Sequence, residues 1–148
     1  MSRTSPSPQI KAAVARRRCA LQHRGVEEYV SNRIALGRRG EDLAAEHLVA
    51  LGYRILARNW RCRQGEIDII AAQSDVLAFV EVKTRSTLAY GHPFEAITPA
   101  KLARLRRLAA SWCAENDPHV TVLRIDAIAV LLPYTGRPRI EHLTGVHS

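Results

Sequence analysis

The chain has 148 residues, enough for one domain with a core of its own. It contains no apolar run long enough to cross a bilayer, and its charged N-terminus lacks the apolar stretch of a signal peptide. We therefore expect a cytoplasmic protein with no membrane association. Three widely spaced cysteines argue against both a disulfide framework and a zinc site.

The net charge of +8 is unevenly distributed along the chain. Residues 1–39 carry nine basic and two acidic side chains, a net charge of +7, whereas the remainder carries 13 basic and 12 acidic ones, a net charge of +1. Such a basic arm can hold phosphates or can be a solvated tail. The sequence predicts a basic, mobile N-terminal extension over residues 1–30 and a folded domain over residues 31–148.

The folded part opens with a predicted helix from Ser31 to about Leu51, where apolar residues recur at helical spacing. Gly37 and Gly40 lie early in this helix, and each costs about 1 kcal/mol relative to alanine. This part of the helix is therefore predicted to be either loose or in close contact with another backbone.

Three strands are predicted next. Tyr53–Trp60 alternates apolar and basic residues, whereas Glu66–Ala72 and Val76–Lys83 are apolar runs joined by the tight turn Ser74–Asp75. The last two strands are expected to be central in the sheet, and Val76–Lys83 to be covered on both faces, because it offers almost no polar position.

A second helix is predicted from the N-cap pair Thr98–Pro99 to about Glu115. Val120–Leu132 follows as a long strand, and Arg139–Leu143 as a short edge strand. The order of elements predicts an α/β fold, in which a mixed central sheet carries a helix on each face.

Charged residues interrupt the two central strands at one level. If Ser74 and Asp75 form a two-residue turn, Asp68 lies opposite Glu81, and Lys83 shares a face with Glu81 because side chains alternate along a strand. Two acids directly opposite each other destabilise a sheet unless a cation compensates them. Lys83 can neutralise one acid, whereas a divalent ion such as Mg²⁺ would hold both. The pattern therefore predicts a metal site.

A metal held by Asp68 and Glu81 would polarise a phosphoryl oxygen, while Lys83 would orient a water molecule or stabilise the developing charge. This chemistry is phosphodiester hydrolysis. The alternative is an ion pair between Glu81 and Lys83, with Asp68 capping a turn. That alternative is weaker because neither strand has the alternating polar face of an exposed sheet.

Four motifs within residues 34–143 carry a family resemblance: Gly37-Arg38-Arg39-Gly40-Glu41, Asn59-Trp60-Arg61, Gly65-Glu66-Ile67-Asp68 and Phe79-Val80-Glu81-Val82-Lys83-Thr84-Arg85. Together they resemble the YraN family of bacterial proteins, which is similar to archaeal Holliday junction resolvases. Those resolvases belong to the restriction-endonuclease-like superfamily with its PD-(D/E)-x-K site. The resemblance implies an αβββαβ core, although Ile67 stands where the superfamily pattern has a proline.

The resemblance also implies roles for individual residues. Asp68, Glu81 and Lys83 match the catalytic triad of the superfamily, and Glu41 matches the glutamate on the first helix of the resolvase-like branch. We expect Asp68 and Glu81 to hold Mg²⁺, with Mn²⁺ as a substitute, and the backbone of Val82 to supply a further oxygen.

Four basic residues are predicted to contact nucleic acid: Arg38, Arg39, Arg85 and Lys101. A solvated surface position is the alternative for each of them. The predicted function is a Mg²⁺-dependent nuclease that acts on DNA, including branched or damaged DNA, and that can work as a homodimer. The alternative function is a non-catalytic module that binds nucleic acid or assembles a complex while retaining the nuclease fold.

Overall fold

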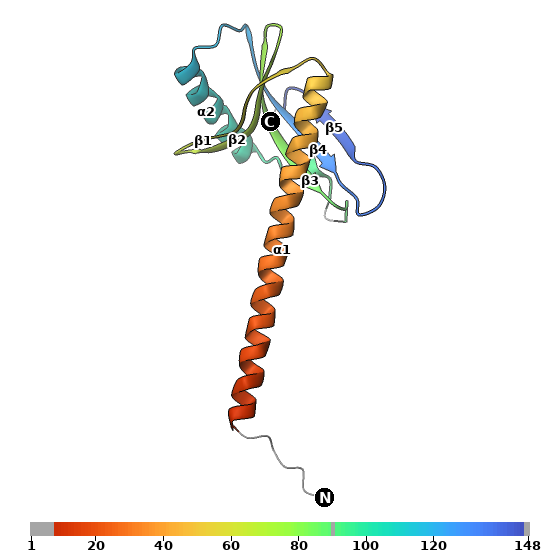
Figure 1. The fold of residues 1–148 in the computed structure, drawn as a ribbon. Helices are drawn as coiled ribbons and strands as arrows, with labels where there is room; N and C mark the ends of the chain where they lie inside the picture. The colour runs from red at the N-terminus through yellow and green to blue at the C-terminus, as the bar shows by residue number, and fades with distance from the viewer. Residues whose placement is uncertain (1–7, 90, 147–148) are drawn as a thin grey trace, which may run out of the picture. The chain divides into compact units, whose positions relative to one another are not determined.

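The computed structural model describes residues 8–89 and 91–146 of the chain (Figure 1). The chain divides into two units between Ala35 and Leu36, and the sheet lies entirely in the second. Within the described ranges, no helix combines the length and the apolar character that a membrane span requires.

The first helix, α1, runs from Pro8 to Ala50 and so begins well before the predicted start at Ser31. The prediction relied on apolar periodicity, which reports the burial of one helix face, whereas helix propensity alone leaves no such pattern. The mobility predicted for residues 1–30 stays a prediction, and its first seven residues lie outside the described part of the chain.

Five strands form one sheet in the order β1-β2-β3-β4-β5. Neighbouring strands are antiparallel except for β3 and β4, which are parallel, so the sheet is mixed as predicted. This confirms the predicted fold class and is consistent with a restriction-endonuclease-like core. The elements after α1 are β1 (Arg54–Cys62), β2 (Gly65–Gln73), β3 (Val76–Arg85), the 3-10 turn η1 (Pro93–Ala96), α2 (Pro99–Asn116), β4 (Val122–Leu131) and β5 (Arg139–Leu143).

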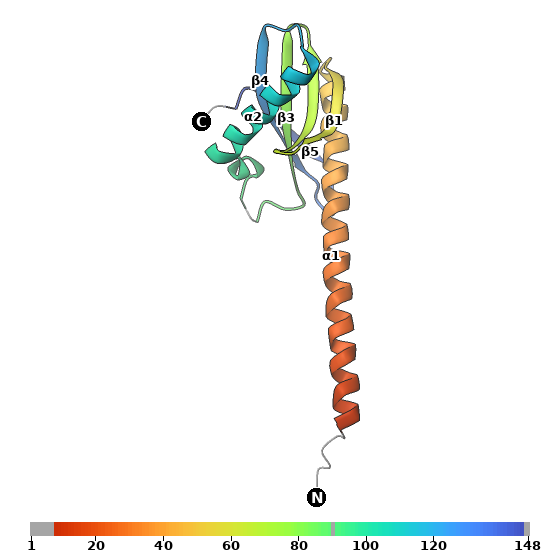
Figure 2. The same cartoon turned by 90° about the vertical axis from the view of Figure 1, so that its left-hand side faces the viewer.

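The sheet is covered on both faces, one helix to each, as Figure 2 shows for α2. Leu48 near the end of α1 packs with Val80 of β3, and Leu105 of α2 packs with Phe79 of the same strand. Even-numbered residues of β3 therefore face α1, and odd-numbered residues face α2. Because Glu81 is odd-numbered, its side chain belongs to the α2 face.

Gly40 lets α1 approach the end of β3 closely. A Cβ atom at this position would lie within 2.8 Å of Thr84 Cβ, whereas a Cβ at Gly37 would meet nothing within 4 Å. Of the two explanations predicted for these glycines, close backbone contact is therefore the one that holds at Gly40. The approach brings the helix residue Glu41 toward the sheet.

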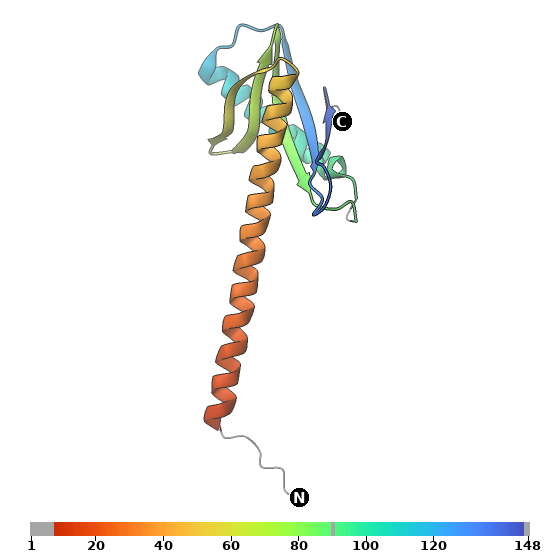
Figure 3. The ribbon, with the colours of Figure 1, turned by 45° about the vertical axis from the view of Figure 1, so that its right-hand side comes forward.

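A buried carboxylate joins the far edge of the sheet to its interior, where β5 lies beside β4 (Figure 3). Asp126 of β4 has no solvent exposure and accepts hydrogen bonds from Arg124 at 2.7 Å, His142 of β5 at 2.9 Å and the Gly145 backbone at 2.9 Å. Burial tends to raise the pKa of Asp126, but these hydrogen bonds outweigh it and hold the pKa below its ordinary value.

Candidate functional site

The hairpin of β2 and β3 has the predicted two-residue turn and register. Gln73 pairs with Val76, and the pairing continues as far as Ile69 opposite Val80. The next position along β2 is Asp68, which is partly buried.

Beyond the Ile69–Val80 pair, a side chain of β2 contacts the backbone of β3. Asp68 Oδ2 accepts the backbone N–H of Val82 at 2.7 Å. The carboxylate of Asp68 is therefore fixed against β3, next to Glu81 in the sequence of that strand.

Glu81 is the second acid of the site and is only 5% exposed. Its Oε1 atom lies 2.7 Å from Lys83 Nζ and 2.5 Å from Lys101 Nζ. Lys101 lies in the first turn of α2, where its backbone N–H donates a hydrogen bond to the hydroxyl of the N-cap residue Thr98 at 3.2 Å. The structure therefore brings Asp68, Glu81 and Lys83 together.

Lys101 makes this a group of two acids and two ammonium groups, which we call the charge cluster. Burial raises the pKa of Asp68 to about 7, and the negative charge of Glu81 adds to the rise, while the hydrogen bond from Val82 opposes it. The pKa shift shows that the two acids are close enough to repel each other. A nearby cation would stabilise the ionised form of a carboxyl group whose pKa is raised in this way.

The pKa values of the two lysines of the charge cluster are shifted in opposite directions. Burial opposes the charge of Lys83, but its hydrogen bonds with Glu81 and Lys101 raise its pKa above the ordinary value. Burial lowers the pKa of Lys101, and repulsion by Lys83 adds to that effect. Lys83 is therefore the more firmly charged of the two.

The donor atoms of the site suit Mg²⁺, which prefers hard oxygen ligands. Two carboxylates are sufficient, because Mg²⁺ commonly keeps several water molecules and takes substrate phosphate as a further ligand. Across residues 8–89 and 91–146, no group of three or more His, Cys, Asp or Glu side chains gathers for a metal ion. Val82 contributes its N–H to Asp68, and the metal-binding role of its backbone oxygen stays a prediction.

Glu41 lies near the charge cluster, since its negative charge contributes to the raised pKa of Asp68. Its Oε2 atom accepts a hydrogen bond from Asn59 Nδ2 of β1 at 3.0 Å. Asn59 has a left-handed backbone with φ of 52° and lies across from Asp68, between the pairs Arg58–Ile69 and Trp60–Ile67.

Sequence reasoning missed the part played by Asn59. Asparagine is one of the few residues enriched at positive φ. An asparagine within an otherwise regular strand pattern was the available signal.

The predicted nucleic-acid contacts are spread over three elements. Arg38 and Arg39 are exposed on α1, and Arg39 lies 3.9 Å from Glu46. Arg85 is partly buried at the end of β3, two residues beyond Lys83. Lys101 contacts Glu81, so it belongs to the charge cluster, and its binding of phosphate stays a prediction.

Comparison with known proteins gives one consistent family. The model of the family described as "Uncharacterised protein family UPF0102" matches residues 40–130. A UPF0102 protein of Arthrobacter sp. (strain FB24) is 58% identical over 111 residues, which are 75% of this chain and 94% of the relative. A UPF0102 protein of Mycolicibacterium smegmatis is 55% identical over 116 residues, which are 77% of this chain and 94% of the relative.

The matched segment includes the motifs from Gly40 to Arg85 that carry the resemblance stated from the sequence. The chain therefore belongs to the UPF0102 family, and its resemblance to the YraN family is confirmed.

Proposed function

We propose that the chain is a cytoplasmic, Mg²⁺-dependent nuclease that hydrolyses phosphodiester bonds in DNA. One observation carries the proposal: Asp68 and Glu81 converge with Lys83 at the point where the β2–β3 pairing gives way to a side-chain contact. Two neighbouring acids beside a firmly charged ammonium group match the requirements of phosphoryl transfer.

Each residue of the site has a role in this proposal. Asp68 and Glu81 would hold Mg²⁺, or Mn²⁺ in its place, and the ion would supply Lewis-acid polarisation of the scissile phosphate. Lys83 would stabilise the negative charge that develops on the phosphate, because its raised pKa keeps it protonated at neutral pH. Glu41, held by Asn59, would orient groups at the rim of the site.

Lys101 is the residue that must respond when a metal ion binds. Its ammonium group contacts Glu81 Oε1 and would compete with a metal ion for that oxygen. Burial lowers the pKa of Lys101, whereas the pKa of Lys83 is raised, so Lys101 is the lysine that loses its charge more readily. Once released, Lys101 stands at the first turn of α2, a suitable place for contact with a phosphate.

The resemblance to Holliday junction resolvases favours branched DNA as the substrate, with damaged DNA as a related possibility. Cutting two strands of a junction requires two active sites related by symmetry, which a homodimer would supply. Arg38 and Arg39, exposed on α1, would contact DNA backbone in this arrangement.

One observation favours a second function. The charge cluster holds two acids and two ammonium groups, so above the pKa of Asp68 its charges balance without a metal ion. A non-catalytic module that binds nucleic acid or assembles a complex could retain such a cluster for stability alone.

A cleavage assay distinguishes the two functions. The full chain is incubated with linear duplex, single-stranded and four-way-junction DNA, with Mg²⁺, with Mn²⁺ and with EDTA. The nuclease function predicts metal-dependent products that disappear in Asp68→Asn, Glu81→Gln and Lys83→Gln. The control is Glu66→Gln, which removes an exposed acid of β2 and should leave cleavage intact.

Calorimetric titration with Mg²⁺ tests the metal site separately from turnover. Wild type should bind the ion and Glu81→Gln should not. DNA binding without cleavage or metal binding would establish the second function instead.

A further inference from the structure

A row of arginines continues from the charge cluster to the edge of the sheet. Arg85 at the end of β3 pairs with Leu131 of β4, and Leu131 pairs with Arg139 of β5. Directly paired residues point to the same face of a sheet, and Arg85 shares its face with Glu81 and Lys83. Both arginines therefore lie on the α2 face, where the proposed chemistry takes place.

Sheet geometry gives the spacing of this row. Arg85 is one side-chain repeat, about 7 Å, beyond Lys83, and Arg139 is two strand spacings, about 10 Å, to the side of Arg85. Backbone spacings of this size suit phosphates that flank the scissile phosphate on the same strand.

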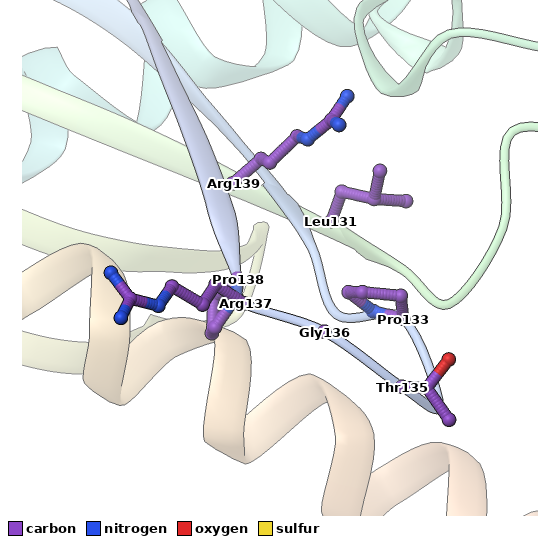
Figure 4. Close-up of a pocket in the computed structure, with 7 residues that line it drawn as sticks. All are labelled: Leu131, Pro133, Thr135, Gly136, Arg137, Pro138 and Arg139. Carbon is purple, nitrogen blue, oxygen red and sulfur yellow. The ribbon is translucent and has the colours of Figure 1, made fainter.

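The loop between β4 and β5 adds a pocket beside Arg139. Its volume is about 400 Å³, and seven residues between 131 and 139 line it. Figure 4 shows Leu131 and Arg139 projecting the same way from neighbouring strands, whereas Arg137 points in another direction.

The same loop carries Tyr134, whose residue surface is 94% exposed, directly after Pro133. An aromatic ring left in solvent gains from covering a flat apolar partner, and a nucleobase is such a partner. In a duplex the base faces are already covered by stacking, so a base that stacks on Tyr134 would be an unpaired one.

Besides the acids of the charge cluster, a further acid lies on the same face and opposes the arginines. Glu141 of β5 pairs with Ala129, which pairs with Lys83. Its Oε2 atom contacts the ring of His92 at 3.2 Å. Glu141 is thus engaged by His92, the N-cap of η1, and lies one side-chain repeat, about 7 Å, from Arg139 on the same strand.

We propose that Arg85, Arg139 and Tyr134 bind an unpaired stretch of the DNA strand beside the scissile phosphate. The arginines hold flanking phosphates through their planar donor groups, and Tyr134 stacks on an exposed base. This inference rests on the proposed nuclease function and narrows its substrate to DNA that carries single-stranded nucleotides next to the cleavage position, as at a gap, fork or branch.

Fluorescence anisotropy in EDTA tests the proposal with two labelled DNAs, a plain duplex and a fork of the same length. Arg139→Gln should weaken binding to both about tenfold at low salt and lower the salt slope by about one. Tyr134→Ala should weaken binding to the fork at least about fivefold and leave duplex binding unchanged, while Tyr134→Phe keeps wild-type affinity.

Two controls accompany these variants. Arg54→Gln removes an exposed arginine where β1 begins, beside the other end of the β2–β3 hairpin, and should bind like wild type. Glu141→Gln removes the acid that β5 contributes to this face and should tighten binding to both DNAs about twofold to fivefold.

The inference and the proposed function fail in distinguishable ways. If wild type cuts DNA in the metal-dependent assay but Arg139→Gln and Tyr134→Ala bind like wild type, the inference is overturned and the nuclease function stands. Equal losses on duplex and fork in Tyr134→Ala would overturn base stacking. If wild type neither binds nor cuts any DNA, both proposals are wrong.

Discussion

Replacing Asp68 with asparagine should stabilise the metal-free protein much more at pH 8 than at pH 5. The folded state raises the pKa of Asp68 from 3.8 to about 7, so it holds the proton more tightly than the unfolded chain does. The stability that this proton contributes is fully present below pH 3.8 and is lost as the pH rises through about 7. Asparagine carries no charge and can still accept the Val82 N–H.

The magnitude follows from the pKa shift. Between pH 5 and the folded pKa of about 7, each pH unit lowers the free energy of unfolding of wild type by about 1.4 kcal/mol. The advantage of Asp68→Asn over wild type should therefore grow by about 3 kcal/mol from pH 5 to pH 8. Comparing the two proteins at each pH removes the contributions of titrating groups that do not interact with Asp68.

Urea unfolding followed by circular dichroism, in EDTA at pH 5 and pH 8, measures this difference. Glu66→Gln is the matched control, because this acid is exposed and its loss should change stability by less than about 0.5 kcal/mol at either pH. An advantage of Asp68→Asn that is the same at both pH values would refute the raised pKa. Added Mg²⁺ should stabilise wild type at pH 8 and leave the asparagine variant unchanged.

Three further predictions concern packing and charge. Gly40→Ala should destabilise the fold by about 1–3 kcal/mol through collision with β3, whereas Gly37→Ala, which meets nothing, should stabilise it by up to about 1 kcal/mol in the same urea assay. Lys101→Gln should tighten Mg²⁺ binding about fivefold in calorimetry, because the competing ammonium group leaves Glu81. Asp126→Ala should lower the free energy of unfolding by about 3–5 kcal/mol, measured by urea denaturation, because it leaves buried donors without their acceptor.

The hairpin of β2 and β3 was predictable because two local rules determine it. A two-residue turn fixes which residues pair, and the alternation of side chains fixes which share a face. The convergence of Asp68 with Glu81 followed from these rules. The replacement of the next backbone pair by a side-chain contact did not, because it depends on how the two strands diverge.

Other features depend on how distant segments meet. Lys101 reaches Glu81 only because α2 crosses the sheet at that level, and a helix pattern gives the buried face but not the point of contact. Asn59 has its left-handed backbone within the paired strands β1 and β2, and the local sequence does not specify that pairing. The start of α1 was misplaced because residues 8–30 carry helix propensity without an apolar stripe.

The buried carboxylate of Asp126 has a consequence for the outermost strand. A terminal strand usually frays first, because only one neighbour holds it. Here His142 of β5 hydrogen-bonds the buried carboxylate of Asp126. Detaching β5 would leave that carboxylate without one of its donors. The edge strand β5 is thus held to the interior of the sheet, and the loop that precedes β5 is anchored at its C-terminal end.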